Sequence, residues 1–156
     1  MNPYLGQDSL EPFLKYKEKG VIVLCRTSNK GAADLQSLPC QFEGKTLPLY
    51  EVVAIKAGRW NTNGNVALVI GATYPEELKT IRQTHPDLPI LIPGVGAQGG
   101  DLALAVKYGI DRHKRGIVIN SSRQIIYASK GADFASAARQ ATLTLRDAIN
   151  QDVARL

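Results

Sequence analysis

The chain has 156 residues, and its 44% hydrophobic and 21% charged content provides enough apolar material for one folded domain over residues 1–156. Its net charge of +5 suits a small anionic ligand, whereas nucleic-acid binding is not expected, because basic and acidic residues are interleaved and only 6% of residues are aromatic. The apolar runs are too short to span a membrane and the N-terminus lacks a secretory signal, so we expect a cytoplasmic protein.

The first part of the chain predicts a helix followed by a strand. Residues 3–5 are typical of the tail of a strand, and residues 8–19 predict a helix. A run of mostly β-branched apolar residues over 21–25 then predicts the first complete strand. In a reducing compartment, Cys25 and Cys40 are expected to remain free thiols.

The middle of the chain predicts a long connection and a second strand. Residues 39–65 form an elaborated connection, within which 50–57 predict a helix. The second apolar run covers 65–70. Thr73 then begins a capping-box sequence, with Glu three residues later, which predicts a helix to about Thr84.

The last part of the chain repeats the same alternation twice. A third strand is predicted over 88–92, and after a glycine-rich stretch a helix is predicted over 101–108. A fourth strand is predicted over 116–120, and a long helix over about 133–153 closes the chain.

This alternation predicts an α/β fold in which four parallel strands stand in sequence order. A closed (β/α)8 barrel needs about 250 residues, so the chain is either a barrel fragment or a complete small open sheet. In a barrel fragment, helices lie on one face of the sheet only. The other face, which would fill the barrel interior, then exposes apolar side chains and leaves a sheet edge open.

The glycine-rich stretch, residues 93–101, is the most informative motif in the sequence. Its four glycines follow a buried strand and precede a helix, so the backbone can approach an anion closely at a positive helix end. No Lys follows the glycines, so the stretch is not the nucleotide-binding phosphate loop, and it does not fit the dinucleotide fingerprint either. The alternative is a tight glycine turn without a ligand.

A second polar group follows the last strand at residues 120–123. Phosphate groups in (β/α) barrels are frequently held by the loops after the last two strands, which here contain the glycines and Arg123. Arg123 could donate two hydrogen bonds to phosphate oxygens, and Gln98 could donate its amide N–H. The alternative for Arg123 is a surface salt bridge to a helix carboxylate.

Two segments together resemble the phosphate-binding end of the orotidine 5'-phosphate decarboxylases. They are the stretch Pro93-Gly94-Val95-Gly96-Ala97-Gln98-Gly99-Gly100-Asp101 and the downstream Asn120-Ser121-Ser122-Arg123. Residues 2–13 and 71–78 are similar to the longer bacterial branch of the same family, so the resemblance covers essentially the whole chain. It implies the C-terminal part of a (β/α)8 TIM barrel, from about the end of strand four to strand eight, and therefore an incomplete barrel.

The resemblance also implies an activity and a set of site residues. Members of the family are lyases that convert orotidine 5'-phosphate to UMP in pyrimidine biosynthesis, with neither a cofactor nor a metal, and they are usually homodimers. The residues that it assigns to the phosphate are Pro93, Gln98, Gly99, Gly100 and Arg123. Ser28 would hydrogen-bond the pyrimidine ring. Many relatives have Gly just before the Arg, where this chain has Ser122, so the chain departs from the family's pattern at a position that the resemblance associates with a backbone contact to phosphate.

One feature of the family is absent from the 156 residues. The family's chemistry relies on an Asp-x-Lys-x-x-Asp motif on strand three, and no such spacing occurs between Met1 and Leu156. We therefore expect that the chain alone is inactive and carries no catalytic residue. It could be a truncated decarboxylase, a stand-alone phosphate- or nucleotide-binding half barrel, or one subunit of a split enzyme that needs an N-terminal half as its partner.

Overall fold

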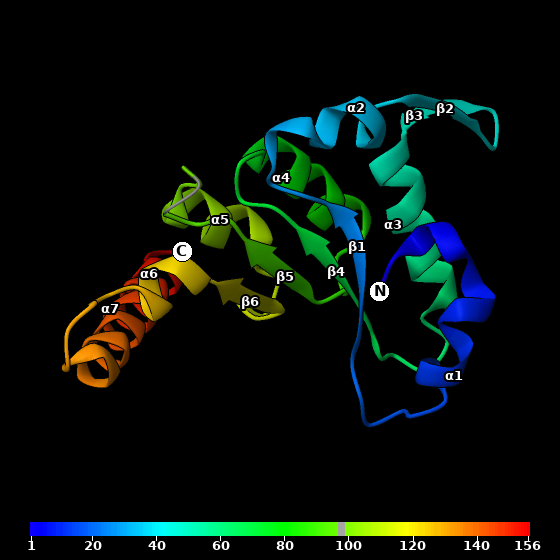
Figure 1. Cartoon of the computed structure of the whole chain (residues 1–156). Helices are drawn as coiled ribbons and strands as arrows, with labels where there is room; N and C mark the ends of the chain where they lie inside the picture. The colour runs from blue at the N-terminus through cyan, green and yellow to red at the C-terminus, as the bar shows by residue number, and fades with distance from the viewer. Residues whose placement is uncertain (97–98) are drawn as a thin grey trace.

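A computed structural model of the chain describes residues 1–96 and 99–156 (Figure 1). Its centre is a four-stranded parallel sheet in the order β1-β4-β5-β6, formed by Val21–Arg26, Val66–Ile70, Ile90–Pro93 and Ile117–Asn120. The strands thus stand side by side in the order in which they occur along the chain. This confirms the predicted α/β fold with a parallel sheet.

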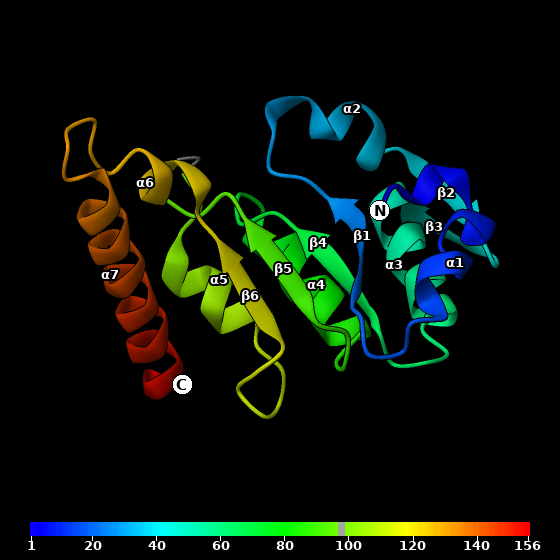
Figure 2. The same cartoon turned by 60° about the horizontal axis from the view of Figure 1, so that its bottom comes forward.

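Helices pack against one face of this sheet. They are α3 (Leu49–Trp60), α4 (Pro75–Thr84) and α5 (Leu102–Gly109), and Figure 2 shows α4 and α5 behind the strands. Alternate strand residues such as Val23, Leu68 and Ile92 point into the core that these helices cover, and all three are fully buried.

The opposite face of the sheet is open. Leu24 pairs with Val69, Val69 with Leu91, and Leu91 with Val118, so these four apolar side chains form one row across all four strands. Leu24 is 39% exposed and Val118 is 59% exposed. Such a row is expected for a sheet whose second face fills a barrel interior, and it does not fit a doubly wound sheet.

The N-terminal prediction was wrong in its details. Residues Pro3–Leu5 form a 3-10 helix, η1, because Pro3 has no N–H to donate to a ladder and the Asn2 side chain accepts from the amide of Tyr4. The strand-like contacts belong to Met1 instead. Its amino group donates to the Ile22 carbonyl, and its own carbonyl accepts from the amide of Leu24.

The helix predicted over 8–19 is reduced to η2 (Gln7–Ser9) and α1 (Glu11–Leu14). The cause is a side chain from far along the sequence. The Asn65 amide nitrogen donates to the carbonyls of Leu14, Tyr16 and Lys19 at 3.1–3.2 Å, so the chain is held in an irregular path after Leu14.

The long connection contains a β-hairpin that the sequence prediction missed. Strands β2 (Pro39–Phe42) and β3 (Lys45–Pro48) are antiparallel, and their turn residues Glu43 and Gly44 both have positive φ, as a two-residue hairpin turn requires. In Figure 1 the hairpin projects away from the main sheet. It is preceded by η3 and α2, over Lys30–Ala32 and Ala33–Gln36.

The helix boundaries after the strands are partly as predicted. Asp101 caps α5 by accepting from the amide of Leu104 at 2.9 Å. Thr73 does not cap α4; its hydroxyl donates to the Ser28 carbonyl at 3.5 Å, so the predicted capping box is wrong. A short helix, α6 (Ser122–Ile126), was not predicted and precedes the long α7 (Phe134–Arg155). Within the described ranges, no helix combines the length and apolarity that crossing a membrane requires.

The two free cysteines differ in their surroundings, and we expect them to differ in reactivity. Burial raises the pKa of the Cys25 thiol to about 12, and the thiol donates to the Tyr50 carbonyl. Because the thiolate is the nucleophile, a thiol reagent at pH 8 should label the partly exposed Cys40 rapidly and Cys25 only on unfolding. Mass spectrometry of the labelled chain, with Cys40→Ser as the control, tests this; rapid labelling of that variant would contradict it.

Candidate phosphate and nucleotide site

The loops that follow the four strands contact one another in sheet order. A Cβ on Gly71, after β4, would lie 2.7 Å from the backbone nitrogen of Ser28, in the loop after β1. A Cβ on Gly100, after β5, would lie 2.5 Å from the Ala72 Cβ, and one on Gly96 would lie 2.7 Å from the Gln124 side chain. A side chain at Gly71 or Gly100 would therefore clash with backbone or Cβ atoms of the neighbouring loop, whereas the flexible Gln124 side chain could move aside at Gly96. The loops at the carboxyl ends of the strands lie against one another in one continuous ledge.

The described glycines of the loop after β5 hydrogen-bond to one another. Gly94, Gly96 and Gly99 all have positive φ, which glycine adopts without strain. The amide of Gly99 donates to the Gly96 carbonyl, and the amide of Gly100 donates to the Gly94 carbonyl. Both amides assigned to the phosphate therefore have partners inside the loop in this conformation. Gln98, the other residue assigned from this loop, lies outside the described residues.

Arg123 lies beside Pro93 in a small cavity of about 50 Å³. The residues that line it are Pro93, Gly94, Val95, Asn120, Ser121, Ser122 and Arg123. About 10–15 Å³ of such space holds one water molecule, so the cavity admits a group of a few heavy atoms. Arg123 is exposed, and its guanidinium forms no ion pair or hydrogen bond with any residue in the described parts of the chain. The surface salt bridge considered as the alternative for Arg123 is not found there.

The helix nearest this cavity is α6, not α5. Arg123 is in the first turn of α6, whereas the N-terminus of α5 already holds the Asp101 carboxylate. Barrel phosphate sites commonly include the N-terminus of a short extra helix after the last strands. The signal for α6 in the sequence was Ser121 followed by Gln124, the spacing of a capping box. Here the Ser121 hydroxyl donates to the Gln124 side chain at 2.7 Å.

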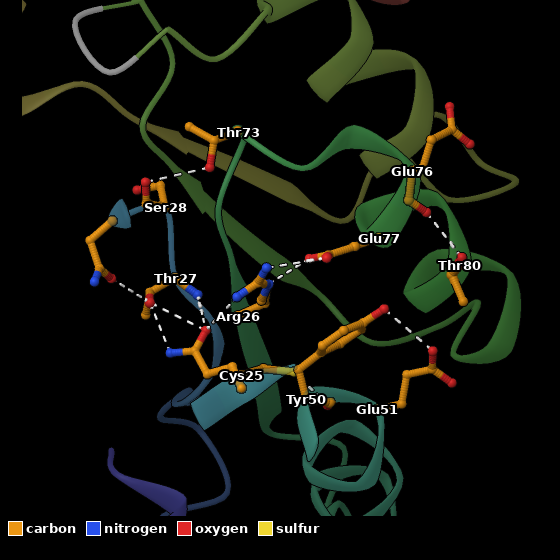
Figure 3. A network of polar contacts seen from close by, with 12 residues as sticks. Cys25, Arg26, Thr27, Ser28, Tyr50, Glu51, Thr73, Glu76, Glu77 and Thr80 are labelled. Carbon is orange, nitrogen blue, oxygen red and sulfur yellow. Dashed lines mark hydrogen bonds and ion pairs between the residues drawn. The ribbon is translucent and has the colours of Figure 1, made fainter. Parts of the chain in front are cut away.

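Ser28 lies at the other edge of the sheet from Arg123, because β1 and β6 are the two outer strands. It stands in the loop after β1, where its carbonyl accepts the hydrogen bond from Thr73 (Figure 3). The structure therefore places the two assigned contacts, Ser28 for the base and Arg123 for the phosphate, at opposite ends of the same ledge.

A buried cation beneath the Ser28 loop was missed by the sequence prediction. Arg26, the last residue of β1, is 1% exposed, and its guanidinium donates to the Glu77 carboxylate at 2.5 and 3.2 Å (Figure 3). The centroids of the Tyr74 and Tyr50 rings lie 4.1 and 5.6 Å, respectively, from the guanidinium carbon of Arg26. Burial also raises the pKa of the Tyr50 phenol. A polar residue at the end of a buried strand was the available signal.

The described residues offer no evident metal site. Among residues 1–96 and 99–156, no three His, Cys, Asp or Glu side chains are grouped closely enough to hold an ion. The polar groups that line the Arg123 cavity are instead hydroxyls, amides and the Arg123 guanidinium, which suit an anionic ligand.

Comparison with known proteins identifies the family. The model of the orotidine 5'-phosphate decarboxylase / HUMPS family matches residues 1–140, most of the chain. The chain belongs to this family. The orotidine 5'-phosphate decarboxylase of Aromatoleum aromaticum is 53% identical over 152 residues, and that of Dehalococcoides mccartyi strain 195 is 51% identical over 149 residues. These alignments cover 97% and 96% of this chain but 55% of each relative, so the chain spans about half the length of the curated relatives it matches.

Solved structures of orotidine 5'-phosphate decarboxylases agree with the fold. The UMP synthase of Leishmania donovani matches with a TM-score of 0.82 and 44% identity, over 97% of this chain and 32% of that one. The orotidine 5'-phosphate decarboxylase of the same organism matches with a TM-score of 0.79 and 42% identity, over 97% of this chain and 55% of that one. The parallel sheet with its one open face thus corresponds to part of an orotidine 5'-phosphate decarboxylase barrel.

Proposed function

We propose that this chain is the nucleotide-binding portion of an orotidine 5'-phosphate decarboxylase, a lyase that converts orotidine 5'-phosphate to UMP. One observation carries the proposal. In a member of this family, the four loops at the carboxyl ends of the strands form one ledge, with the Arg123 cavity at one end and Ser28 at the other. As a half barrel over residues 1–156, the chain would supply the part from about the end of strand four to strand eight.

In this proposal the phosphate binds between Pro93 and Arg123. The Arg123 guanidinium, which has no partner among residues 1–96 and 99–156, donates to the phosphate oxygens, and Gln98 adds its side-chain amide. For Gly99 and Gly100 to donate as well, the loop must release their present partners, the carbonyls of Gly96 and Gly94. The donors to the phosphate are the protein's own N–H groups, and the proposal includes neither a cofactor nor a metal, as the resemblance to the family implies.

The base lies toward the opposite edge of the sheet, where the Ser28 side chain would hydrogen-bond the pyrimidine ring. The contacts to phosphate and base then come from different strands, β6 and β1. Because the two contacts are separated by two strands, their contributions to binding can be measured apart, with a ligand that carries the phosphate but no base.

Decarboxylation requires groups that these 156 residues do not supply. The Asp-x-Lys-x-x-Asp spacing is absent from them, so we propose that catalysis depends on an N-terminal half barrel that carries it, because a second copy of this chain in a homodimer would lack the spacing too. The open row from Leu24 to Val118 is apolar, as a barrel interior would be. A second candidate is a stand-alone nucleotide-binding half barrel, favoured by the fact that all the assigned phosphate residues lie in this one chain.

Replacement of Arg123 tests the phosphate site. Arg123→Ala should weaken the binding of UMP by about 1.5–3 kcal/mol, the usual contribution of a charge-assisted hydrogen bond. Isothermal titration calorimetry measures the change. Arg139→Ala is the matched control, because Arg139 is an exposed residue of α7 and its loss changes the net charge equally. Equal affinities of the two variants for UMP would remove Arg123 from the site.

A further inference from the structure

Arg26 is a buried charge with an unusually complete set of partners. Its side chain donates two hydrogen bonds to Glu77 and one, at 3.4 Å, to the Gln36 side-chain oxygen, and it packs over the Tyr74 ring. Burying an ion pair costs desolvation energy, and apolar residues of similar volume often stabilise a fold as well or better. A role beyond stability is therefore worth testing for this residue.

The partners of Arg26 close the loop that carries Ser28. Gln36 lies at the end of α2, and its side-chain oxygen accepts both from Arg26 and, at 2.9 Å, from the amide of Thr27. Gln36 also donates to the Thr27 hydroxyl at 2.8 Å. The Gln36 side chain thus joins the two ends of residues 27–36 and also accepts from the Arg26 guanidinium.

The other partners of Arg26 fix the neighbouring loop against the Ser28 loop. Glu77 lies in the first turn of α4, in the same connection as Gly71 and Thr73. Gly71 touches the Ser28 backbone, and Thr73 donates to the Ser28 carbonyl. The ion pair between Arg26 and Glu77 therefore joins the end of β1 to the loop that supports Ser28 from the other side.

We propose that Arg26 is a positioning residue for the base-binding end of the site. Through Gln36 and Glu77 it holds the loop over 27–36, and hence the Ser28 side chain, in the position from which it meets the pyrimidine. The inference rests on the proposed function, which assigns that contact to Ser28. The phosphate end, at Arg123 on the far edge of the sheet, lies outside the reach of this network.

The test separates base recognition from phosphate recognition. Arg26→Met removes the guanidinium and keeps an unbranched apolar side chain, and Gln36→Met removes the loop closure while leaving the buried ion pair in place. Arg59→Met is the matched control. It breaks an exposed ion pair between Arg59, in α3, and Glu43, in the turn of the β2–β3 hairpin. Calorimetry with UMP and with ribose 5-phosphate, and amide hydrogen exchange over 27–36, are measured for all variants of the full chain.

We expect Arg26→Met to weaken UMP binding about tenfold, roughly 1.4 kcal/mol, and ribose 5-phosphate binding less than about twofold. Amide exchange of Thr27 and its neighbours should accelerate, since the Thr27 amide loses a fixed acceptor. Gln36→Met should act in the same direction, and it serves in its place if Arg26→Met does not fold. Arg59→Met should change neither binding nor exchange.

Each other outcome is decisive. Unchanged exchange over 27–36 overturns the inference, whatever the ligands do, because the loop is then not held by this network. Faster exchange with an equal loss of both ligands also overturns it, since the role is then only structural. If the wild-type chain binds neither ligand, the proposed function fails together with the ligand half of the inference. The exchange data then still decide whether Arg26 orders the loop.

Discussion

The chain by itself is expected to bind UMP and to leave orotidine 5'-phosphate unconverted. Binding energy from the phosphate lies far from the reacting carbon, and it accelerates a reaction only when catalytic groups are present to use it. Preorganised charge at the developing carbanion is usually the largest catalytic contribution, and the Lys and Asp array that would provide it is absent from the 156 residues. Loss of orotidine 5'-phosphate absorbance, followed with the purified chain, measures the rate.

Co-expression with a partner half should restore turnover. The partner is an N-terminal half barrel from a relative that carries the Asp-x-Lys-x-x-Asp strand, whose sheet can continue this one and cover the open row of Leu24 and Val118. Because the rate without the array is near that of the uncatalysed reaction, the gain should span many orders of magnitude. Co-expression of Arg123→Ala is the control and should be slower. Turnover by the chain alone would show that the proposed dependence on a partner is wrong.

Replacement of Arg82 should destabilise the fold by about 3 kcal/mol or more. Arg82 lies in α4, is 8% exposed, and donates to five backbone carbonyls among the described residues. These acceptors are His85, Pro86, Leu88, Gly109 and Gly116, at 2.7–3.3 Å. They belong to the end of α4, the approach to β5, the end of α5 and the residue before β6. A buried carbonyl left without a donor costs about 1–3 kcal/mol. The loss of stability from several such carbonyls together therefore exceeds the loss caused by a typical single substitution.

Urea unfolding of Arg82→Met, followed by circular dichroism, measures this loss of stability. Burial lowers the pKa of the Arg82 guanidinium from its ordinary value, which reflects the desolvation that its carbonyl partners offset. Arg112→Met is the matched control, because Arg112 is exposed and its ion pair with Asp87, at 3.7 Å, should contribute little. An equal change in the free energy of unfolding for both variants would contradict the role assigned to Arg82.

The sequence alone determined the parts of this protein that depend on local pattern. Four apolar runs predicted the four strands of the main sheet and their parallel order, because short buried strands separated by helices leave few other topologies. The Gly-rich stretch and Arg123 were expected at the carboxyl ends of the last two strands, and the structure places both there. Their role with phosphate stays a prediction, as does that of Ser28.

Only the tertiary structure decided the parts that depend on residues distant in sequence. The Asn65 side chain donates to a carbonyl at the end of α1, some fifty positions earlier in the chain. Arg26 donates to the Glu77 carboxylate, fifty-one positions later. The amides of Gly99 and Gly100 donate to the carbonyls of Gly96 and Gly94, and residue propensities do not predict these hydrogen bonds. Propensity and periodicity predict which face of a segment is buried and which is exposed to solvent. The hydrogen-bond partners of a buried polar group depend instead on which residues the folded chain brings close to it.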